Sequence, residues 1–292
     1  MSTPLLVFLF LSAVWGSTWL FIKLGLADLP PFTFAGIRFV IAVFPLLVVL
    51  AARRPPLPRR AADWWLMIWT GILTFAVAYG LVFWGEQHVS SGLTSILYTT
   101  MPLFGLILAH FFVQGEPMTF RRLGGVLLGI VGVVLVFSRE LVSEDPLAIW
   151  GSLGILGSSL ASAVAATAVK RRAGHLDLSL LTAVQMLAGL VLLLAIGIPL
   201  EGSPLYFRWT PMAVASLLYL ALVGSALPFV LYYWLIRRIP VTQVQLIPLV
   251  STLIAVLLGA VVLGERLGWW TALGAAGVLV GLVLATLRRS EK

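Results

Sequence analysis

The sequence predicts an all-α integral membrane protein with ten transmembrane helices, arranged as two inverted five-helix repeats. Three observations predict it. The 292 residues are 61% hydrophobic and only 10% charged, whereas a soluble domain is nearer half apolar and a quarter charged. Hydrophobic stretches of membrane-spanning length occupy nearly the whole chain, which leaves no room for a separate soluble domain. The second half also repeats landmarks of the first half at a nearly constant distance.

Polar residues, glycines and prolines bound each predicted span. The first span has no basic region before it and nine spans follow it, so we interpret it as retained rather than as a cleaved signal peptide. In chain order the predicted spans are 4–26, 31–51, 63–85, 90–113, 120–138, 147–169, 177–199, 211–235, 240–263 and 267–287.

Corresponding residues identify the repeat. Because each half holds five spans, an odd number, the two halves are expected to cross the membrane in opposite directions. The predicted repeats are 1–142 and 143–292. The matched residues are Gly115-Glu116 with Gly264-Glu265, Gly125 with Gly274 and Gly132 with Gly281, all 149 positions apart, and Lys23 with Lys170 and Arg38 with Gln185, which are 147 apart.

Lysine and arginine orient the predicted spans. If the N-terminus is cytoplasmic, 14 of the 19 basic residues fall at cytoplasmic span ends, four fall at the opposite ends, and Arg38 lies inside a span. This bias follows the positive-inside rule, so we expect a multi-pass protein of the plasma (inner) membrane with both termini in the cytoplasm. Anionic lipid is a sufficient partner for the net charge of +8, and no nucleic acid is implied.

Several function classes have no support in the sequence. All 11 acids fall at span ends or in loops, so no carboxylate marks a proton relay at mid-membrane. No phosphate-binding loop, metal-ligand spacing or catalytic constellation is visible, and cysteine is absent. We therefore expect no cofactor, no metal and no enzymatic activity. A channel would need a continuous polar stripe or a charged ring, which is also not visible.

The chain resembles the EamA-type drug/metabolite transporters, which are ten-helix carriers built from two five-helix repeats. The resemblance covers essentially the whole chain and implies export or exchange of small metabolites, often amino acids, through a central cavity. One departure is that Pro102 corresponds to Ser251, while the second repeat carries Pro248 instead. The residues that carry the resemblance are Trp15-Gly16-Ser17-Thr18-Trp19, Pro102 through Gly115-Glu116, Gly264-Glu265, and the glycine-rich fifth and tenth spans.

The two prolines predict interrupted helices at corresponding places. Proline in a helix frees the carbonyl four residues earlier, which is that of Tyr98 for Pro102 and that of Val244 for Pro248. Interrupted helices in both repeats indicate a binding site. The alternative is a plain kink, with serine or threonine bonded back to its own helix. Polar residues near the two breaks are Tyr98, Thr99, Thr100, Gln243, Gln245, Ser251 and Thr252.

Arg38 is the basic residue furthest inside a span, about 10 Å along the helix from Pro31. An intramembrane arginine is costly unless it is paired or reaches water. Three interpretations stay open from the sequence. The side chain snorkels to the outer surface, it pairs with Glu86, or it binds a substrate carboxylate.

The remaining candidate site residues are aromatic or small and polar. Trp15, Tyr79 and Tyr98 are predicted to line the cavity and to stack on a substrate, although aromatic residues also pack between helices. Ser162 lies in the sixth span where the first has its Trp-Gly-Ser-Thr segment. Glycine-rich faces on the fifth and tenth spans predict close helix packing, either internal or in a dimer. The full predicted site is Trp15, Arg38, Tyr79, Tyr98, Thr99, Ser162 and Gln245.

The sequence thus predicts a secondary transporter that moves small amphipathic metabolites, with amino acids favoured, by alternating access. A channel-like pore for small solutes and a proton-coupled drug exporter are the alternatives. Membrane lipids and a small-molecule substrate are the expected partners, and the chain is expected to be a monomer or a homodimer.

Overall fold

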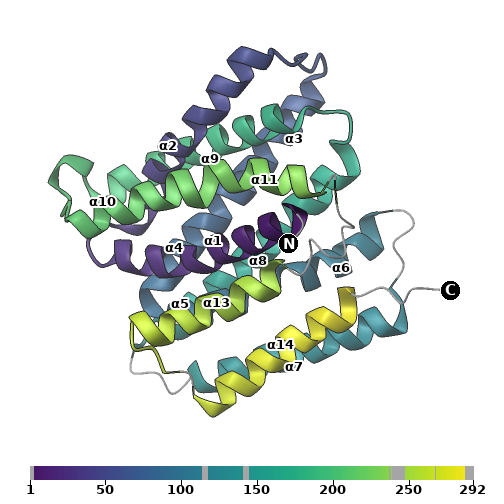
Figure 1. The fold of residues 1–292 in the computed structure, drawn as a ribbon, viewed down its shortest axis with the longest axis vertical. Coiled ribbons are helices and arrows are strands. Elements are labelled where there is room, and N and C mark those ends of the chain that lie inside the picture. The colour runs from purple at the N-terminus through teal and green to yellow at the C-terminus, as the bar shows by residue number, and fades with distance from the viewer. Residues whose placement is uncertain are drawn as a thin grey trace.

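A computed structural model describes residues 3–113, 118–140, 145–236, 238, 247–266 and 268–286. Every regular element in these ranges is a helix (Figure 1). Six of the helices are long and apolar enough to cross a membrane, and three shorter apolar helices follow them. The predicted all-α membrane architecture is confirmed.

The described helices form ten successive spans whose ends lie within a few residues of the predicted ones, except where the described ranges begin later. The spans are α1 (Thr3–Leu26); α2 (Pro31–Arg53); α3 (Ala61–Gly71), η1 (Ile72–Ala78) and α4 (Tyr79–His88); α5 (Ser91–Tyr98) and α6 (Met101–Phe112); α7 (Phe120–Glu140); α8 (Ala148–Arg172); α9 (Leu178–Glu201); α10 (Pro211–Leu218), η3 (Tyr219–Ala226) and α11 (Leu227–Ile236); α13 (Ile247–Val262); and α14 (Trp269–Thr286).

Three spans are interrupted within the residues that the structure describes. The third and eighth spans each contain a π-helix, η1 and η3, which begin 147 positions apart at Ile72 and Tyr219. The fourth span breaks between α5 and α6 at Thr99 and Thr100, next to Pro102, as the proline predicts. Such departures from α-helical bonding are frequent at functional sites. They mark the middle of the bundle as the place to look for one.

Helix packing follows the repeat. The second span packs on the seventh (α2 on α9) and the fifth on the tenth (α7 on α14). The first span packs on the ninth (α1 on α13), and in the same way the sixth packs on the fourth (α8 on α5 and α6). Exchanging the two halves therefore exchanges equivalent contacts, as expected of two related five-helix units. Figure 1 shows α7 and α14 side by side along one edge of the bundle.

Two contacts made by loop residues are also equivalent when the two halves are exchanged. The Thr210 hydroxyl donates to Oδ2 of Asp28 at 2.6 Å, which joins the first loop to the start of the eighth span. His175 Nε2 lies 3.1 Å from Oδ1 of Asp63, which joins the corresponding loop to the start of the third span. Position 175 is 147 after 28, and position 210 is 147 after 63. The repeat is thus visible in side-chain contacts that its sequence pattern does not reveal.

The glycine-rich faces pack against each other within one chain. A Cβ atom added to Gly132 would lie 2.5 Å from the carbonyl oxygen of Gly274, and one added to Gly281 would lie 2.5 Å from that of Gly125. Such distances leave no room for a side chain. The predicted packing role of these faces is confirmed, and the partner of α7 at these positions is α14.

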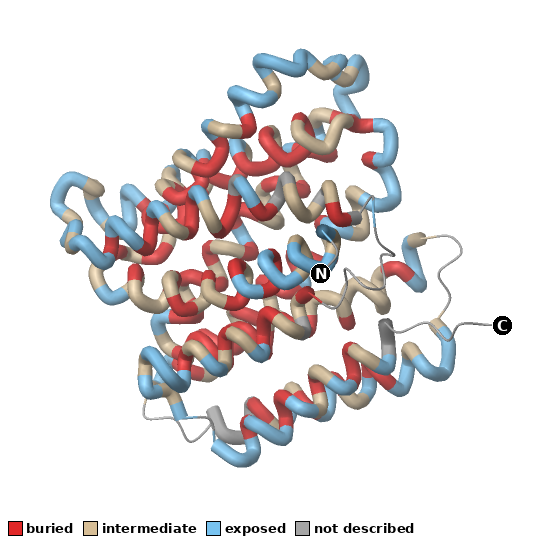
Figure 2. Tube along the Cα trace, viewed as in Figure 1, coloured by how far each residue is buried: buried red, intermediate tan, exposed pale blue. Residues whose placement is uncertain are grey.

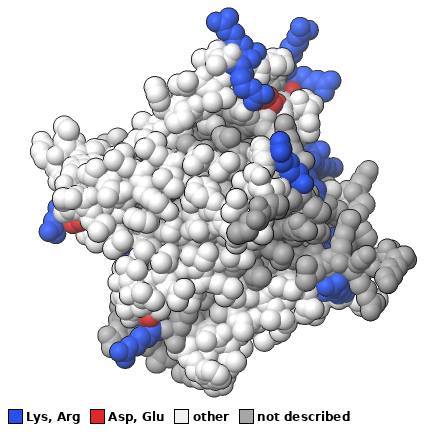
Figure 3. All heavy atoms as spheres, in the orientation of Figure 1, with Lys and Arg blue, Asp and Glu red and all other residues white. Residues whose placement is uncertain are grey.

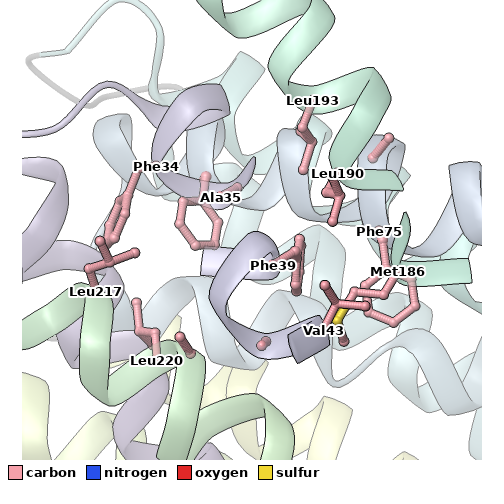
Figure 4. Close-up of a cluster of buried hydrophobic side chains, with 14 of the residues drawn as sticks. Phe34, Ala35, Phe39, Val43, Phe75, Met186, Leu190, Leu193, Leu217 and Leu220 are labelled. Carbon is pink, nitrogen blue, oxygen red and sulfur yellow. The ribbon is translucent and has the colours of Figure 1, made fainter. Parts of the chain in front are cut away.

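The largest buried cluster joins both halves. Phe39 and Val43 of α2 lie beside Phe75 of η1 and Met186 of α9, and Phe34 of α2 lies beside Leu217 of α10 (Figure 4). Buried positions concentrate in these inner helices (Figure 2). In contrast, large apolar side chains such as Phe44 and Val191 are exposed. In Figure 3 charged side chains lie at the margins of the visible face, and an uncharged surface of the kind that contacts lipid separates them.

Candidate functional site

Arg38 lies inside the bundle with 2% of its surface exposed. Its Nε donates to the Ser225 hydroxyl at 3.1 Å, and Ser225 in turn donates to the carbonyl of Leu220 within η3. Its guanidinium carbon lies 5.1 Å from the ring centre of Tyr79 and 5.9 Å from that of Phe83. Aromatic faces attract a cation, especially away from water. Nη1 has no hydrogen-bond partner among the described residues.

Two of the interpretations of Arg38 are therefore wrong. The side chain does not snorkel, because it is buried rather than exposed at the outer surface. It also does not pair with Glu86, since no nitrogen–oxygen contact within 4.0 Å joins them and both Glu86 oxygens lack hydrogen-bond partners within the described ranges. The packing of α2 against η3 directs Arg38 to Ser225 instead. Binding of a substrate carboxylate by Arg38 stays a prediction.

Tyr98 is held between the first and sixth spans. Its hydroxyl shares a hydrogen bond with that of Ser162 on α8 at 3.1 Å, and its ring centre lies 5.3 Å from that of Trp19 on α1. Tyr98, Trp19 and Tyr79 all border the large buried cluster and keep part of their surface accessible. The structure thus brings the predicted residues Tyr79, Tyr98 and Ser162 into one region that also borders Arg38.

The break in the fourth span meets the ninth span. The hydroxyl groups of Thr99 and Thr252 are within hydrogen-bonding distance, which joins α5 to α13. The Tyr98 carbonyl, which Pro102 leaves without a helical donor, accepts a hydrogen bond from Ser159 of α8 at 3.4 Å. A freed carbonyl inside a membrane must find such a partner. Thr99 thus lies where corresponding spans of the two halves cross.

Trp15 is joined to another part of the bundle. Trp15 packs on Tyr232 of α11, with ring centres 5.4 Å apart, and belongs to a different buried cluster. Trp15 lies one helical turn before Trp19 on the same face of α1, so the two tryptophan rings follow each other along that face. Gln245 and Gln243 lie outside the described residues.

Sequence reasoning missed the role of Lys23, and it named Glu86 only as a possible partner of Arg38 or as an alternative proton carrier. In the last turn of α1, Lys23 donates from Nζ to the carbonyls of Glu86 at 2.6 Å and Val89 at 2.7 Å. It therefore caps the C-terminal end of α4, where unpaired carbonyls gather. The Glu86 side chain is fully buried. Their sequence signal was weak, because both residues lie near predicted span ends, where charges are ordinary.

Glu265 also has a role that differs from the expected one. The sequence predicts that the two acids of the repeated Gly-Glu pairs, Glu116 and Glu265, cap the next helix or pair with a neighbouring arginine, Arg121 or Arg266. Instead Glu265 accepts hydrogen bonds from the backbone N–H groups of Ser91 and Gly92, at 2.8 and 3.1 Å, and caps α5 in the other half of the chain. Its counterpart Glu116 lies outside the described residues.

The assembled groups suit recognition. A buried guanidinium binds a carboxylate or phosphate, hydroxyl groups bind polar atoms of either kind, and aromatic faces contact apolar or cationic groups. No cluster of three or more metal-ligating side chains occurs in the described ranges.

Comparisons with known proteins agree with this architecture. The model of the EamA-like transporter family matches residues 3–138 and again 149–287. The chain is 29% identical over 279 residues to the uncharacterized transporter YoaV of Bacillus subtilis, covering 96% of this chain and 95% of YoaV. It is 32% identical over 285 residues to the uncharacterized inner membrane transporter YedA of Escherichia coli K12, covering 94% and 87%. A solved crystal structure shares the fold with a TM-score of 0.68 at 19% identity, over 98% of this chain and 97% of that one.

Proposed function

Since the chain belongs to the EamA-like transporter family, we propose that it is a secondary transporter which moves small amphipathic metabolites across the inner membrane by alternating access. Amino acids are the substrate class we favour. Two relatives carry the name transporter, and one of them is called an inner membrane transporter. Neither name includes a substrate, so the substrate class rests on the chemistry of the site.

One observation carries this proposal. Arg38 is buried beside the aromatic rings of Tyr79 and Phe83, and its Nη1 has no hydrogen-bond partner within the described residues. A buried guanidinium with free donors is a site for a carboxylate. The rings of Tyr98 and Trp19 border the same buried cluster and offer contacts for an apolar side chain. A cation beside aromatic and hydroxyl groups matches an amphipathic acid such as an amino acid.

The exchange symmetry of the helix contacts supports alternating access. Among the described residues the interrupted spans are the third, fourth and eighth, and they pack on the first, second, sixth and ninth. In transporters with inverted repeats, rocking of one repeat against the other opens a central site first to one side and then to the other. Closely related contacts at both ends, such as Asp28 with Thr210 and Asp63 with His175, are suited to alternate opening.

The test is counterflow in proteoliposomes with a panel of radiolabelled amino acids. We expect at least one of them to enter faster when vesicles are preloaded with the same compound, and we expect uptake to saturate. Uptake that rises linearly with concentration and ignores preloading would support the channel-like alternative.

Exchange is also expected to persist when an uncoupler collapses the proton gradient, because every acid lies at a span end or in a loop. Complete loss of counterflow under these conditions would instead favour a proton-coupled exporter. The solutions inside and outside the vesicles should be buffered at the same pH, so that the only change is the loss of the proton gradient.

A further inference from the structure

Glu86 is a buried acid that the proposed substrate site does not use. It lies in the last turn of α4, its surface is fully covered, and neither carboxylate oxygen has a hydrogen-bond partner in the described ranges. An ionised carboxylate in this position has lost its hydration and gained no partner, which is strongly disfavoured. A neutral carboxyl group suffers a much smaller penalty. The arrangement is therefore one in which Glu86 holds a proton.

The nearest cation is committed elsewhere. Lys23 Nζ donates to the backbone carbonyls of Glu86, Gln87 and Val89, at 2.6, 3.4 and 2.7 Å. An ammonium group has three hydrogens, so these three acceptors account for all of them. Lys23 thus binds the end of α4 while leaving the Glu86 side chain without a donor.

The other charged groups around α4 also leave Glu86 without a partner. From α2, Arg38 is within electrostatic reach but directs its Nε to Ser225. Beside α5, Glu265 is within reach and is held by the backbone of Ser91 and Gly92. Beside α8, Asp145 lies 3.0 Å from His88. The π-helix η1 contains no charged residue.

The surroundings favour a proton over a larger ligand. A Cβ atom added to Gly85 would lie 2.6 Å from the carbonyl oxygen of Gly151, so α4 and α8 pack backbone against backbone beside Glu86. A metal cation would need several oxygen ligands around it, whereas the charged neighbours of Glu86 include two cations, Lys23 and Arg38. A proton needs neither a cavity nor additional ligands.

We propose that Glu86 is a proton-binding site linked to closure of the end of the bundle where α1 meets α4. In the closed state Glu86 is neutral and Lys23 caps the carbonyls of α4. When this end opens, water reaches the carboxyl group, the proton leaves to that water, and the carboxylate attracts Lys23 away from the carbonyls. Binding of the proton and closure then favour each other, as linkage requires. This inference rests on the proposed function, because it concerns the closing step of the same transporter.

The first test needs no substrate. Infrared spectra of the purified protein in lipid should show the carbonyl band of a protonated carboxylic acid at neutral pH. The band should disappear in both Glu86→Gln and Glu86→Leu and should remain in Glu265→Gln, because the Glu265 carboxylate accepts hydrogen bonds from the Ser91 and Gly92 N–H groups, whereas Glu86 has no partner within the described ranges. A spectrum without this band in the wild-type protein, or a band that survives both Glu86 variants, overturns the proposal.

The second test is counterflow of a radiolabelled amino acid at external pH values from 5 to 9, a range chosen to bracket titration of a buried acid. Over the pH range in which opening of this end limits the rate, wild-type exchange should become faster as the external pH rises, by at most about tenfold per pH unit for a single proton. Glu86→Gln should be slow at all pH values and vary less than about twofold. A variant that keeps the wild-type pH profile contradicts the proposal. If the wild-type protein shows no counterflow with any amino acid, the proposed function fails, while the infrared test still decides whether Glu86 holds a proton.

Discussion

Arg38 and Gln185 occupy corresponding positions in the two halves, and they differ in charge. Each lies on the second span of its half and donates to a hydroxyl on the third span of the other half. Arg38 Nε donates to Ser225 at 3.1 Å, and Gln185 Nε2 donates to Thr70 at 2.8 Å. Both acceptors lie within or beside the π-helices η1 and η3. The two contacts join equivalent pairs of spans through donors at corresponding positions, but the acceptors are not corresponding residues and the donors differ in charge.

The comparison separates what the fold requires from what a ligand requires. A neutral glutamine satisfies the contact between the second and third spans in the second half, so a buried charge is not needed for packing. In the first half the bundle instead buries a guanidinium, which is expensive in a membrane protein. That asymmetry is the reason to assign anion binding to Arg38 and only a packing role to Gln185.

The largest expected effect is a difference in cysteine labelling between the two halves, because labelling that reports topology is all-or-none. Leu57 and Leu205 are exposed residues in corresponding loops of the two halves. If the repeats are inverted, single cysteines at these positions face opposite sides of the membrane. A membrane-impermeant maleimide should label Leu205→Cys in intact cells and Leu57→Cys only after permeabilisation. Labelling of both cysteines from outside would show that the two loops face the same side of the membrane and that the halves are not inverted.

Making the first half resemble the second should nearly abolish transport. Arg38→Gln keeps a donor for Ser225 but removes the charge that we assign to the substrate carboxylate. Loss of a hydrogen bond to a charged group costs about 1.5–3 kcal/mol, or roughly ten- to hundredfold in affinity. The measurement is binding of the counterflow substrate by calorimetry in detergent, with the melting temperature recorded for each variant.

Gln185→Leu is the matched control in the second half. It removes the hydrogen bond to Thr70, which still donates to the carbonyl of Leu66 at 2.6 Å. We expect the free energy of unfolding to fall by about 1 kcal/mol while substrate affinity stays unchanged. Equal losses of affinity in Arg38→Gln and Gln185→Leu would mean that both contacts serve packing alone.

Tyr98→Ala tests the region where the two halves cross. The variant removes a ring that lies 5.3 Å from Trp19 and a hydroxyl that bonds Ser162, so we expect substrate affinity to fall about tenfold, by loss of roughly one stacking contact and one hydrogen bond. Tyr206→Ala is the control, since Tyr206 is 88% exposed in a loop. Tyr98→Ala that binds normally would remove Tyr98 from the site, whereas early melting in proportion to weak binding would indicate packing. Gln245→Leu is predicted to behave like Tyr98→Ala.

The repeat and its spans could be predicted from the sequence because both depend on patterns along the chain. Hydropathy gives the span lengths, and constant offsets give the correspondence of Lys23 with Lys170 or Gly132 with Gly281. Pro102 predicts a local break for the same reason, since its effect is confined to its own helix. These features need no knowledge of which helices are neighbours.

The partners of buried charges could not be predicted in this way. Arg38 bonds Ser225, which is 187 positions away, and Lys23 reaches carbonyls about 63 positions away. Glu86 was one predicted partner of Arg38, but helix packing directs Arg38 to Ser225, and Lys23 reaches the backbone carbonyls of Glu86 and Val89 rather than the Glu86 carboxylate. The π-helices were also missed, because η1 contains no proline or glycine, and the one glycine of η3, Gly224, does not remove a backbone donor as Pro102 does in the fourth span.

The smallest expected effect concerns two acids that cap helices near the same end of the bundle. Glu265 is enclosed by the start of α5, whereas Asp145 is substantially exposed beside α8. The Leu147 N–H, which donates to Oδ1 at 2.8 Å, and the adjacent His88 lower the pKa of Asp145 below its usual value. A lowered pKa means that this contact stabilises the fold above the ordinary titration range of aspartate and is lost as the pH falls through the lowered value.

Asp145→Asn should therefore reduce the melting temperature at pH 7 by no more than about 2 °C, and the difference should vanish in acid below that range. Because Asp145 is exposed, salt should also diminish the difference. A penalty that persists unchanged in strong acid would show that the amide disturbs packing rather than removing a charge.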